Sequence, residues 1–232
     1  MKRLAIFDLD GTIFRSSLTI ELLELLIEEG VFPEKAKKMF ARPYARWLDR
    51  KGSYEEYILA TVRAFEIYFK GKKRKDVMKI ARKVAAFHQD RVYRYTRDLL
   101  KRLKRQGYYL VAISHSSAMV VHAFGKKLGF DKVYGRLHEV DSRGRFTGRH
   151  LFVDTIDDKA NLVKHLVDKK GYSLRGSIGV GDTESDSRFL EMVETPICFN
   201  PNLKLYKHAK RHGWTVVVER KDVIYVMNKG SR

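Results

Sequence analysis

The chain begins with a short apolar segment that ends in two closely spaced carboxylates. Residues 4–7 read Leu-Ala-Ile-Phe, and Asp8, Leu9, Asp10 and Gly11 follow directly. The apolar run favours a buried strand, and Gly11 lets the backbone turn after it. Residues two apart in a strand point to the same face, so Asp8 and Asp10 are expected to look into one cavity. Two ionised carboxylates this close need a cation beside them, which predicts a divalent metal site and chemistry on a phosphate.

Three later segments place polar side chains after predicted strands or at the start of a predicted helix. They are, in chain order, Ser114 at the end of the strand over 108–114, Lys159 at the start of a helix, and Asp182 and Asp186 after the strand over 177–180. The carboxyl ends of parallel strands meet at one edge of a sheet. We therefore expect these side chains to form one site with Asp8.

These four segments, in this order, resemble the four motifs of the haloacid dehalogenase superfamily. A lone Asp-x-Asp-Gly-Thr can be a surface turn, and a serine after a strand or a lysine on a helix is commonplace, so their order carries the resemblance. The resemblance implies that Asp8 is the nucleophile that forms an aspartyl-phosphate and that Asp10 is the general acid and base. It also implies that Ser114 and Lys159 are catalytic residues that bind the phosphate.

The same resemblance implies Mg²⁺ as the cofactor. The implied protein ligands are Asp8, the backbone carbonyl of Asp10, and Asp182, which are oxygen ligands of the kind that Mg²⁺ prefers. Asp186 lies four residues further on, where it would either hold a metal-bound water or orient Lys159.

Two residues beside these motifs are candidates for substrate binding. His115 follows the second motif, where contact with substrate and simple packing are the alternatives to a catalytic role. Thr183 follows the fourth motif, where it either forms a turn or reaches the phosphate. Asp157 or Asp158 is expected to cap the helix of the third motif rather than to bind metal.

From residue 91 onward, strand-like segments alternate with helix-like segments. We expect helices over 95–105, 118–128, 158–169, 184–192 and 203–212, and strands over 108–114, 132–134, 177–180, 196–199 and 215–218, with a hairpin turn at 141–144. Repeated β-α units predict an α/β fold, with a three-layer, Rossmann-like parallel sheet whose ligand site lies at the carboxyl ends of its strands. The last stretch, 220–232, ends in polar residues and is expected to fray.

Helical spacing interrupts this pattern over residues 15–89. Four short helices are expected there, from about Leu18 to Gly30 and over 33–48, 53–69 and 74–89. A helical bundle between the first two motifs is similar to the first class of cap domain (C1 type) of the phosphoserine-phosphatase-like branch, subfamily IB. The resemblance implies a hydrolase core of residues 1–14 and 90–232 with a helical cap of residues 15–89.

The second motif departs from phosphoserine phosphatases, which typically have Ser-Gly-Gly where this chain has Ser114, His115 and Ser116. The larger side chains could occupy space that the substrate uses. The resemblance therefore implies a Mg²⁺-dependent phosphomonoesterase for a small phosphorylated metabolite other than phosphoserine. Two alternatives remain open: a phosphatase of a phospholipid or other surface-bound phosphate, and a non-catalytic, basic nucleic-acid-binding protein on the same fold.

The net charge of +19 is the extreme feature of the composition, and it implies attraction to anions. The densest cluster of basic residues runs from Lys70 to Lys83. No aromatic residues are interleaved with it as in a recognition motif, so we expect solvated helix faces, weak attraction to anionic surfaces and no dedicated nucleic-acid site.

Targeting and redox features of the sequence predict a cytoplasmic protein. The single cysteine, Cys198, cannot form an internal disulfide. The apolar run after Met1 is broken by Asp8, unlike a secretory signal. No apolar stretch approaches the roughly 18 residues of a transmembrane segment.

Overall fold

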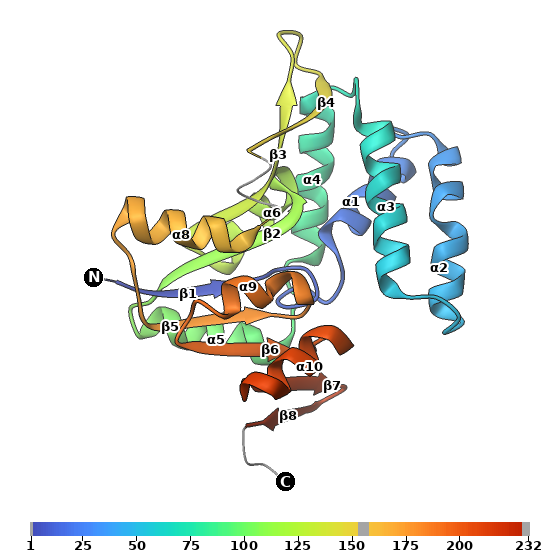
Figure 1. Ribbon diagram of the computed structural model, residues 1–232. Coiled ribbons are helices and arrows are strands. Elements are labelled where there is room, and N and C mark those ends of the chain that lie inside the picture. The colour runs from blue at the N-terminus through green and yellow to red at the C-terminus, as the bar shows by residue number, and fades with distance from the viewer. Residues whose placement is uncertain (1, 153–157, 229–232) are drawn as a thin grey trace.

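Eight strands form one sheet in the computed structural model, which describes residues 2–152 and 158–228 (Figure 1). The strands are β1 (Arg3–Phe7), β2 (Tyr109–Ser117), β3 (Lys132–Val140), β4 (Phe146–Leu151), β5 (Ser173–Gly181), β6 (Thr195–Phe199), β7 (Thr215–Arg220) and β8 (Val223–Met227). Their order across the sheet is β4-β3-β2-β1-β5-β6-β7-β8. The strands from β3 to β7 in this order are parallel, and β4 and β8 are antiparallel edges.

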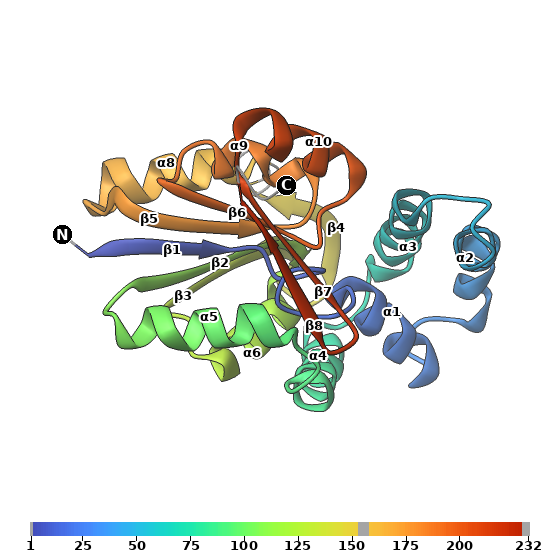
Figure 2. The same ribbon diagram turned by 90° about the horizontal axis from the view of Figure 1, so that it is seen from below.

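Helices cover both faces of this sheet (Figure 2). The helices are α5 (Arg94–Arg105) and α6 (Ala118–Leu128) on one face, and α8 (Lys159–Lys170), α9 (Ser187–Leu190) and α10 (Leu203–His212) on the other. The side chains of β1 alternate between the two apolar layers: Ala5 and Phe7 pack in the cluster that holds α5 and α6, whereas Leu4 and Ile6 pack in the cluster that holds α8 to α10. The predicted three-layer α/β fold is confirmed.

The chain between β1 and α5 is helical, and its first helices lie beside the carboxyl ends of the strands (Figures 1 and 2). Its elements are α1 (Leu18–Glu28), the 3₁₀ helix η1 (Glu34–Met39), α2 (Ala41–Leu48), α3 (Tyr54–Phe69) and α4 (Arg74–His88). The two connections to the sheet run side by side, because Phe14 bridges to Val92 and the Arg15 amide donates to the Arg91 carbonyl (3.2 Å). α4 packs against α1 and also against α6, which covers one face of the sheet. The division into core and cap stays a prediction.

The predicted helix over 33–48 is two helices in the structure. η1 ends at Met39, and α2 begins at Ala41. In one continuous helix the amide of residue 43 would donate to the Met39 carbonyl, but Pro43 has no N–H. Proline is tolerated in the first turn of a helix, so α2 restarts two residues before it. Similarly, the helix predicted over 184–192 is the 3₁₀ helix η2 (Glu184–Asp186) followed by α9.

Two predictions for the edges of the sheet need correction. The expectation that 220–232 frays is wrong for β8, which pairs along its length with β7. The two strands are joined by Lys221 and Asp222, and Lys221 has a φ of 54°, in the left-handed region that a short hairpin needs. β3 extends to Val140 rather than ending at 134, because the predicted turn at 141–144 pairs it with β4. Residues 229–232 lie outside the described residues.

Among the helices of the described residues, none is long and apolar enough to cross a membrane.

Candidate active site

The structure brings the four sequence motifs together at one edge of the sheet. Asp8 directly follows β1, Asp182 directly follows β5, and Ser114 lies in β2. β2 and β5 pair with β1 on its two sides, so the three side chains leave neighbouring strands. Lys159 is the first residue of α8, and its side chain reaches Asp8.

Lys159 is the centre of a buried charge cluster. Its Nζ lies 2.5 Å from Oδ1 of Asp8 and 2.6 Å from Oδ1 of Asp186. The three side chains are 2%, 7% and 0% exposed, respectively. Buried charges are tolerated where each is paired and hydrogen-bonded. Here two carboxylates share one ammonium, so one negative charge remains to be compensated.

Asp186 is hydrogen-bonded through both of its oxygens. Oδ1 accepts from Lys159, and Oδ2 accepts from the backbone amides of Asp182 (3.0 Å) and Thr183 (3.2 Å). A Cβ at Gly181 would lie 2.6 Å from the Asp186 carboxylate, which shows how closely this side chain approaches the end of β5. The geometry makes Asp186 a residue that holds the Lys159 ammonium in place.

Asp10 contacts a separate set of donors. Its Oδ2 accepts from the Ser114 hydroxyl (2.6 Å), and its Oδ1 accepts from the Leu18 amide (2.5 Å). The Ser114 oxygen accepts in turn from the Ser116 amide (2.9 Å). Leu18 is the first residue of α1, where the helix dipole favours a carboxylate. Asp10 therefore connects the start of α1 to β2.

Burial raises the pKa of three carboxyl groups at the site, those of Asp8, Asp10 and Asp182. It raises the pKa of Asp8 to about 7, although Lys159 acts in the opposite direction. It also raises the pKa of Asp10 and of Asp182, the latter with help from the charge of Asp8. The charges of Asp186 and Asp8 raise the pKa of Lys159 against the effect of its burial. The ammonium stays charged, and the carboxylates crowd more negative charge than it neutralises.

Three of these carboxylates lie close enough to share a cation. One oxygen from each of Asp8, Asp182 and Asp186 lies within 4.8 Å of the others. Oδ2 of Asp8 is buried and has no hydrogen-bond partner among the described residues. Such an oxygen is costly to leave unpaired, and a divalent cation with oxygen ligands satisfies it. The donor set therefore fits Mg²⁺.

Two residues at the site were not assigned a role from the sequence. Thr12 is fully buried, and its hydroxyl donates to Oδ1 of Asp182 (3.1 Å). Its place in the Asp-x-Asp-Gly-Thr segment was the available signal. Tyr54 begins α3 and remains 42% exposed; its partial burial and the charges of Asp10 and Asp182 raise the pKa of its phenol. Tyr54 thus brings a phenol from the helical insert near the Asp10 and Asp182 carboxylates.

The structure gives the remaining candidates local positions. His115 is half-buried in β2, and its substrate contact stays a prediction. Thr183 caps η2 with its side chain, so the turn role is present and contact with phosphate stays a prediction. Asp158 caps α8 by accepting from the Ala160 amide (3.0 Å). Asp157 lies outside the described residues.

Comparison with known proteins identifies relatives along most of the chain. The model of the haloacid dehalogenase-like hydrolase family matches residues 5–191. The histidinol-phosphatase of Neisseria meningitidis serogroup C is 23% identical over 94% of this chain and 99% of the relative. The inhibition of morphological differentiation protein of Streptomyces azureus is 26% identical over 92% and 77%. The phosphoserine phosphatase of Archaeoglobus fulgidus is 24% identical over 86% of this chain and 53% of the relative.

Solved structures share the fold. A protein of unknown function from Bordetella pertussis Tohama I superposes with a TM-score of 0.74 at 20% identity, covering 93% of this chain and 98% of that one. A phospho-aspartyl intermediate analogue of phosphoserine phosphatase superposes with a TM-score of 0.62 at 20% identity, covering 95% of each chain. At these identities the likeness concerns the fold.

Proposed function

This chain belongs to the haloacid dehalogenase-like hydrolase family, and we propose that it is a Mg²⁺-dependent phosphomonoesterase. In this proposal it removes phosphate from a small phosphorylated metabolite of the cytoplasm through an aspartyl-phosphate on Asp8. The observation that carries the proposal is the state of the Asp8 carboxylate. One oxygen is bonded to Lys159, while the other is buried without a partner among the described residues, as expected of a group that meets a cation and a phosphate.

A carboxylate that attacks a phosphate must overcome the repulsion between like charges. That repulsion is about 4 kcal/mol per charge pair at 4 Å with an effective dielectric near 20. The Lys159 ammonium, 2.5 Å from Asp8, offsets part of it. Asp8 then attacks phosphorus, the bond from phosphorus to the leaving oxygen breaks, and water hydrolyses the aspartyl-phosphate in a second step.

Asp10 is suited to move the proton in both steps. Burial raises the pKa of its carboxyl, so a larger fraction of the group carries a proton at neutral pH than in an exposed aspartate. In the first step it gives a proton to the leaving alkoxide, and in the second it takes one from the attacking water. Ser114, whose hydroxyl lies 2.6 Å from Asp10, would donate to a phosphoryl oxygen when substrate is bound.

The Asp8 and Asp182 carboxylates would hold the Mg²⁺ ion, with the Asp10 backbone carbonyl as a third ligand. When bound, the ion supplies positive charge that stabilises the phosphate oxygens. Thr12 would orient Asp182 through the hydrogen bond to Oδ1. Asp186 has both oxygens bonded, so we assign it to the positioning of Lys159 rather than to direct ligation.

The proposed substrate class rests on the relatives and on the second motif. Histidinol-phosphatase and phosphoserine phosphatase are both named for small phosphorylated substrates. In this chain Ser116 stands where phosphoserine phosphatases typically have a glycine. Its hydroxyl lies 2.8 Å from that of Thr19 on α1. The added side chain fills space beside the site, which argues for a metabolite other than phosphoserine.

The two alternatives differ in what they require of the site. A non-catalytic nucleic-acid-binding protein would have no use for Lys159 buried between two carboxylates. A phosphatase of surface-bound phosphate would keep the same chemistry and differ only in the leaving group. The substrate panel below separates it from an enzyme of soluble metabolites.

Turnover of a generic aryl phosphate tests the proposal. We expect phosphate release with Mg²⁺, none with chelator, and recovery when Mg²⁺ is restored. Equal release in chelator, or none with any divalent ion, would contradict the mechanism. A panel of histidinol phosphate, phosphoserine, other phosphorylated metabolites and phosphatidate vesicles then identifies the leaving group.

A further inference from the structure

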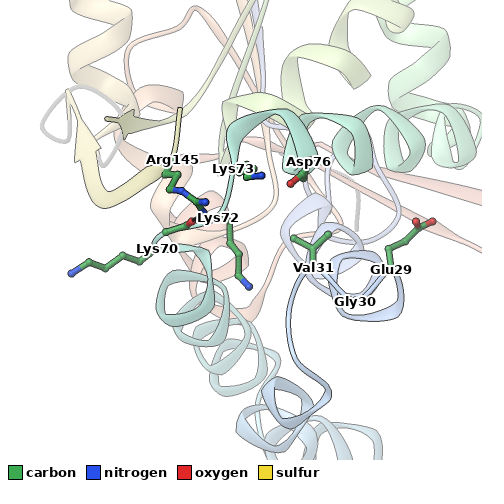
Figure 3. Close-up of a pocket in the computed structure, with 9 residues that line it drawn as sticks. Glu29, Gly30, Val31, Lys70, Lys72, Lys73, Asp76 and Arg145 are labelled. Atoms are coloured by element: carbon green, nitrogen blue, oxygen red, sulfur yellow. Dashed lines mark hydrogen bonds between the residues drawn. The ribbon is translucent and has the colours of Figure 1, made fainter. Parts of the chain in front are cut away.

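A second cluster of charged side chains lies at the opposite end of α3 from Tyr54. An open cavity of about 450 Å³ lies there (Figure 3). It is lined by residues from the end of α1, from the loop between α3 and α4, and from the start of β4. This volume lies within the roughly 300–1,000 Å³ typical of small-molecule sites. Four cationic residues line it: Lys70, Lys72, Lys73 and Arg145.

Backbone bonds hold the loop that carries the three lysines. The Gly71 amide donates to the Phe146 carbonyl (2.7 Å), and the Phe146 amide donates to the Lys72 carbonyl (3.0 Å). The Arg145 guanidinium also donates to the Gly71 carbonyl (2.8 Å). The loop is therefore tied to β4, which fixes the backbone positions from which its lysines extend.

The cations of the cavity are poorly neutralised. Glu29 also lines it, but its carboxylate is paired with Lys83 at 2.5 Å. Asp76 is the other lining carboxylate, so the lining residues include four cations and one acid that is not already paired. Within residues 2–152 and 158–228, none of the three lysines forms an ion pair. Cations gathered around one cavity repel one another, and an anion between them would relieve the repulsion.

The position of Lys72 distinguishes it from the other cations of the cavity. In Figure 3 the Lys72 side chain lies between Arg145 on one side and Val31 on the other, with Glu29 at the far end. Lys72 also lies over the buried Phe32 ring, with Nζ 5.7 Å from its centroid. Half-buried Lys72 is thus the cation best placed to meet a ligand inside the cavity rather than in bulk solvent.

The cavity is separate from the catalytic carboxylates. α3 has 16 residues, and at 1.5 Å per residue it spans about 24 Å. At one end of α3, the charges of Asp10 and Asp182 raise the pKa of Tyr54. At the other end, Phe69 leads into the loop that carries the lysines. None of the cavity's lining residues belongs to the catalytic motifs.

We propose that this cavity binds a compact anion of the diphosphate class, meaning two or more linked or neighbouring phosphate groups. Several cations around one cavity match an anion with more than one charge, and an open cavity of this volume suits a compact ligand better than a long nucleic acid. This inference is independent of the proposed catalytic function. It also differs from the expectation that the Lys70–Lys83 cluster is only a solvated face.

Titration of the full-length protein with inorganic diphosphate tests the proposal. At 0.15 M salt in chelator, we expect saturable shifts of the backbone amide resonances of Gly71 and Lys73. The double variant Lys72→Gln/Lys73→Gln should bind at least tenfold more weakly. The matched control Lys75→Gln/Lys79→Gln removes the same charge from α4 outside the cavity and should change affinity less than twofold.

Each other outcome of this titration overturns the proposal. Equal weakening in both double variants would mean that only the diffuse charge matters. Shifts confined to residues of the catalytic motifs would mean that diphosphate has no second site. Single-stranded RNA that binds tightly through the cavity lysines while diphosphate does not would replace the compact anion with a nucleic acid.

Two further measurements identify the source of the anion and isolate the catalytic proposal. Competition by phosphatidate vesicles, but not by phosphatidylcholine vesicles, would identify a lipid headgroup as the carrier of the phosphates, whereas no competition would identify a soluble anion. Aryl phosphate turnover by Lys72→Gln/Lys73→Gln should stay within twofold of the wild type. A failure of diphosphate binding would therefore leave the phosphatase proposal standing, and the reverse also holds.

Discussion

The carboxylate cluster around Lys159 and the basic cavity around Lys72 hold like charges together in opposite ways. Around Lys159 the carboxylates are buried and bonded to specific donors, with contacts of 2.5 Å to Asp8 and 2.6 Å to Asp186. Around Lys72 the charges are exposed or half-buried, and the bonds hold the backbone rather than the ammonium groups.

Burial, rather than the number of charges, is therefore expected to set how far a substitution changes stability. Removing one member of a buried pair leaves an unpaired charge in a low dielectric, which costs about 3–5 kcal/mol. Removing an exposed charge usually changes stability by no more than about 0.5 kcal/mol. Equal losses of charge in the two regions should therefore have unequal results.

The largest effect is expected for Asp8→Asn. The amide keeps the volume and cannot serve as a nucleophile, so turnover should fall on the order of 10⁴-fold or more. Thermal stability should not fall, because Lys159 keeps its bond to Asp186. The exposed Asp98→Asn on α5 is the control, and near-normal turnover by Asp8→Asn would place the nucleophile elsewhere.

The next largest effect is expected for Lys159→Met. Asp8 and Asp186 would then face each other without a cation, and we expect a loss of about 3–5 kcal/mol in the free energy of unfolding. Denaturation at pH 8 in chelator measures it, since Asp8 is mostly ionised above its pKa of about 7. Lys164→Met on the exposed side of α8 should stay within about 0.5 kcal/mol of the wild type. Equal losses in the two variants would break the comparison.

A smaller effect, dependent on pH, is expected at His138, which lies in β3 and pairs with His150 of β4. Its ring lies 4.6 Å from that of Phe69, and burial lowers its pKa to about 3, with help from the charges of His150 and Arg136. Because an unfolded histidine titrates near 6.5, the unfolded state binds more protons between pH 6.5 and 3. Stability is therefore lost as pH falls through this window, by about 2 kcal/mol at pH 5.

Denaturation midpoints at pH 7 and pH 5 check this prediction. His138→Leu should lose less stability than the wild type on acidification, whereas His165→Leu, at an exposed position of α8, should follow the wild type. The same pH dependence in all three proteins would mean that His138 is not the group that titrates.

The smallest effect is expected for Lys204→Met. Its ammonium lies 2.7 Å from Glu184 beside the fourth motif and 3.5 Å from Glu55 on α3, and the side chain is 63% exposed. Exposed pairs are weak and are screened by salt. KM should change less than twofold at 0.15 M salt and somewhat more at low salt. A larger change that persists at high salt would give this contact a role in holding the insert against the core.

Sequence predicted those elements whose ends are set by local residues. α6 and α10 occupy the predicted ranges because Gly129 and Gly213 end them in the left-handed region, and the Asn202 side chain caps the start of α10. β8 was missed because its apolar run is only five residues long and follows the charged Lys221 and Asp222. The break before α2 depends on Pro43, which the helical spacing did not reveal.

The site residues that directly follow strands could be predicted from the sequence. The hydrogen bonds between residues far apart in the sequence could not. Asp8 and Asp182 could be found because each directly follows a strand. The hydrogen bond from Thr12 to Asp182 joins residues 170 apart and depends on the pairing of β1 with β5. The basic cavity is of the same kind, since its fourth cation, Arg145, reaches the loop of lysines only through the fold of β4.

Covalent capture of the intermediate tests most directly the claim that the buried Asp8 carboxylate is the nucleophile. The protein is quenched with acid during turnover of an aryl phosphate with Mg²⁺, and the peptide that contains Asp8 is measured by mass spectrometry. We predict one added phosphoryl group on Asp8, absent when chelator replaces Mg²⁺. A phosphoryl group on another residue, or an unmodified Asp8 in an enzyme that releases phosphate in a rapid burst, would contradict the account.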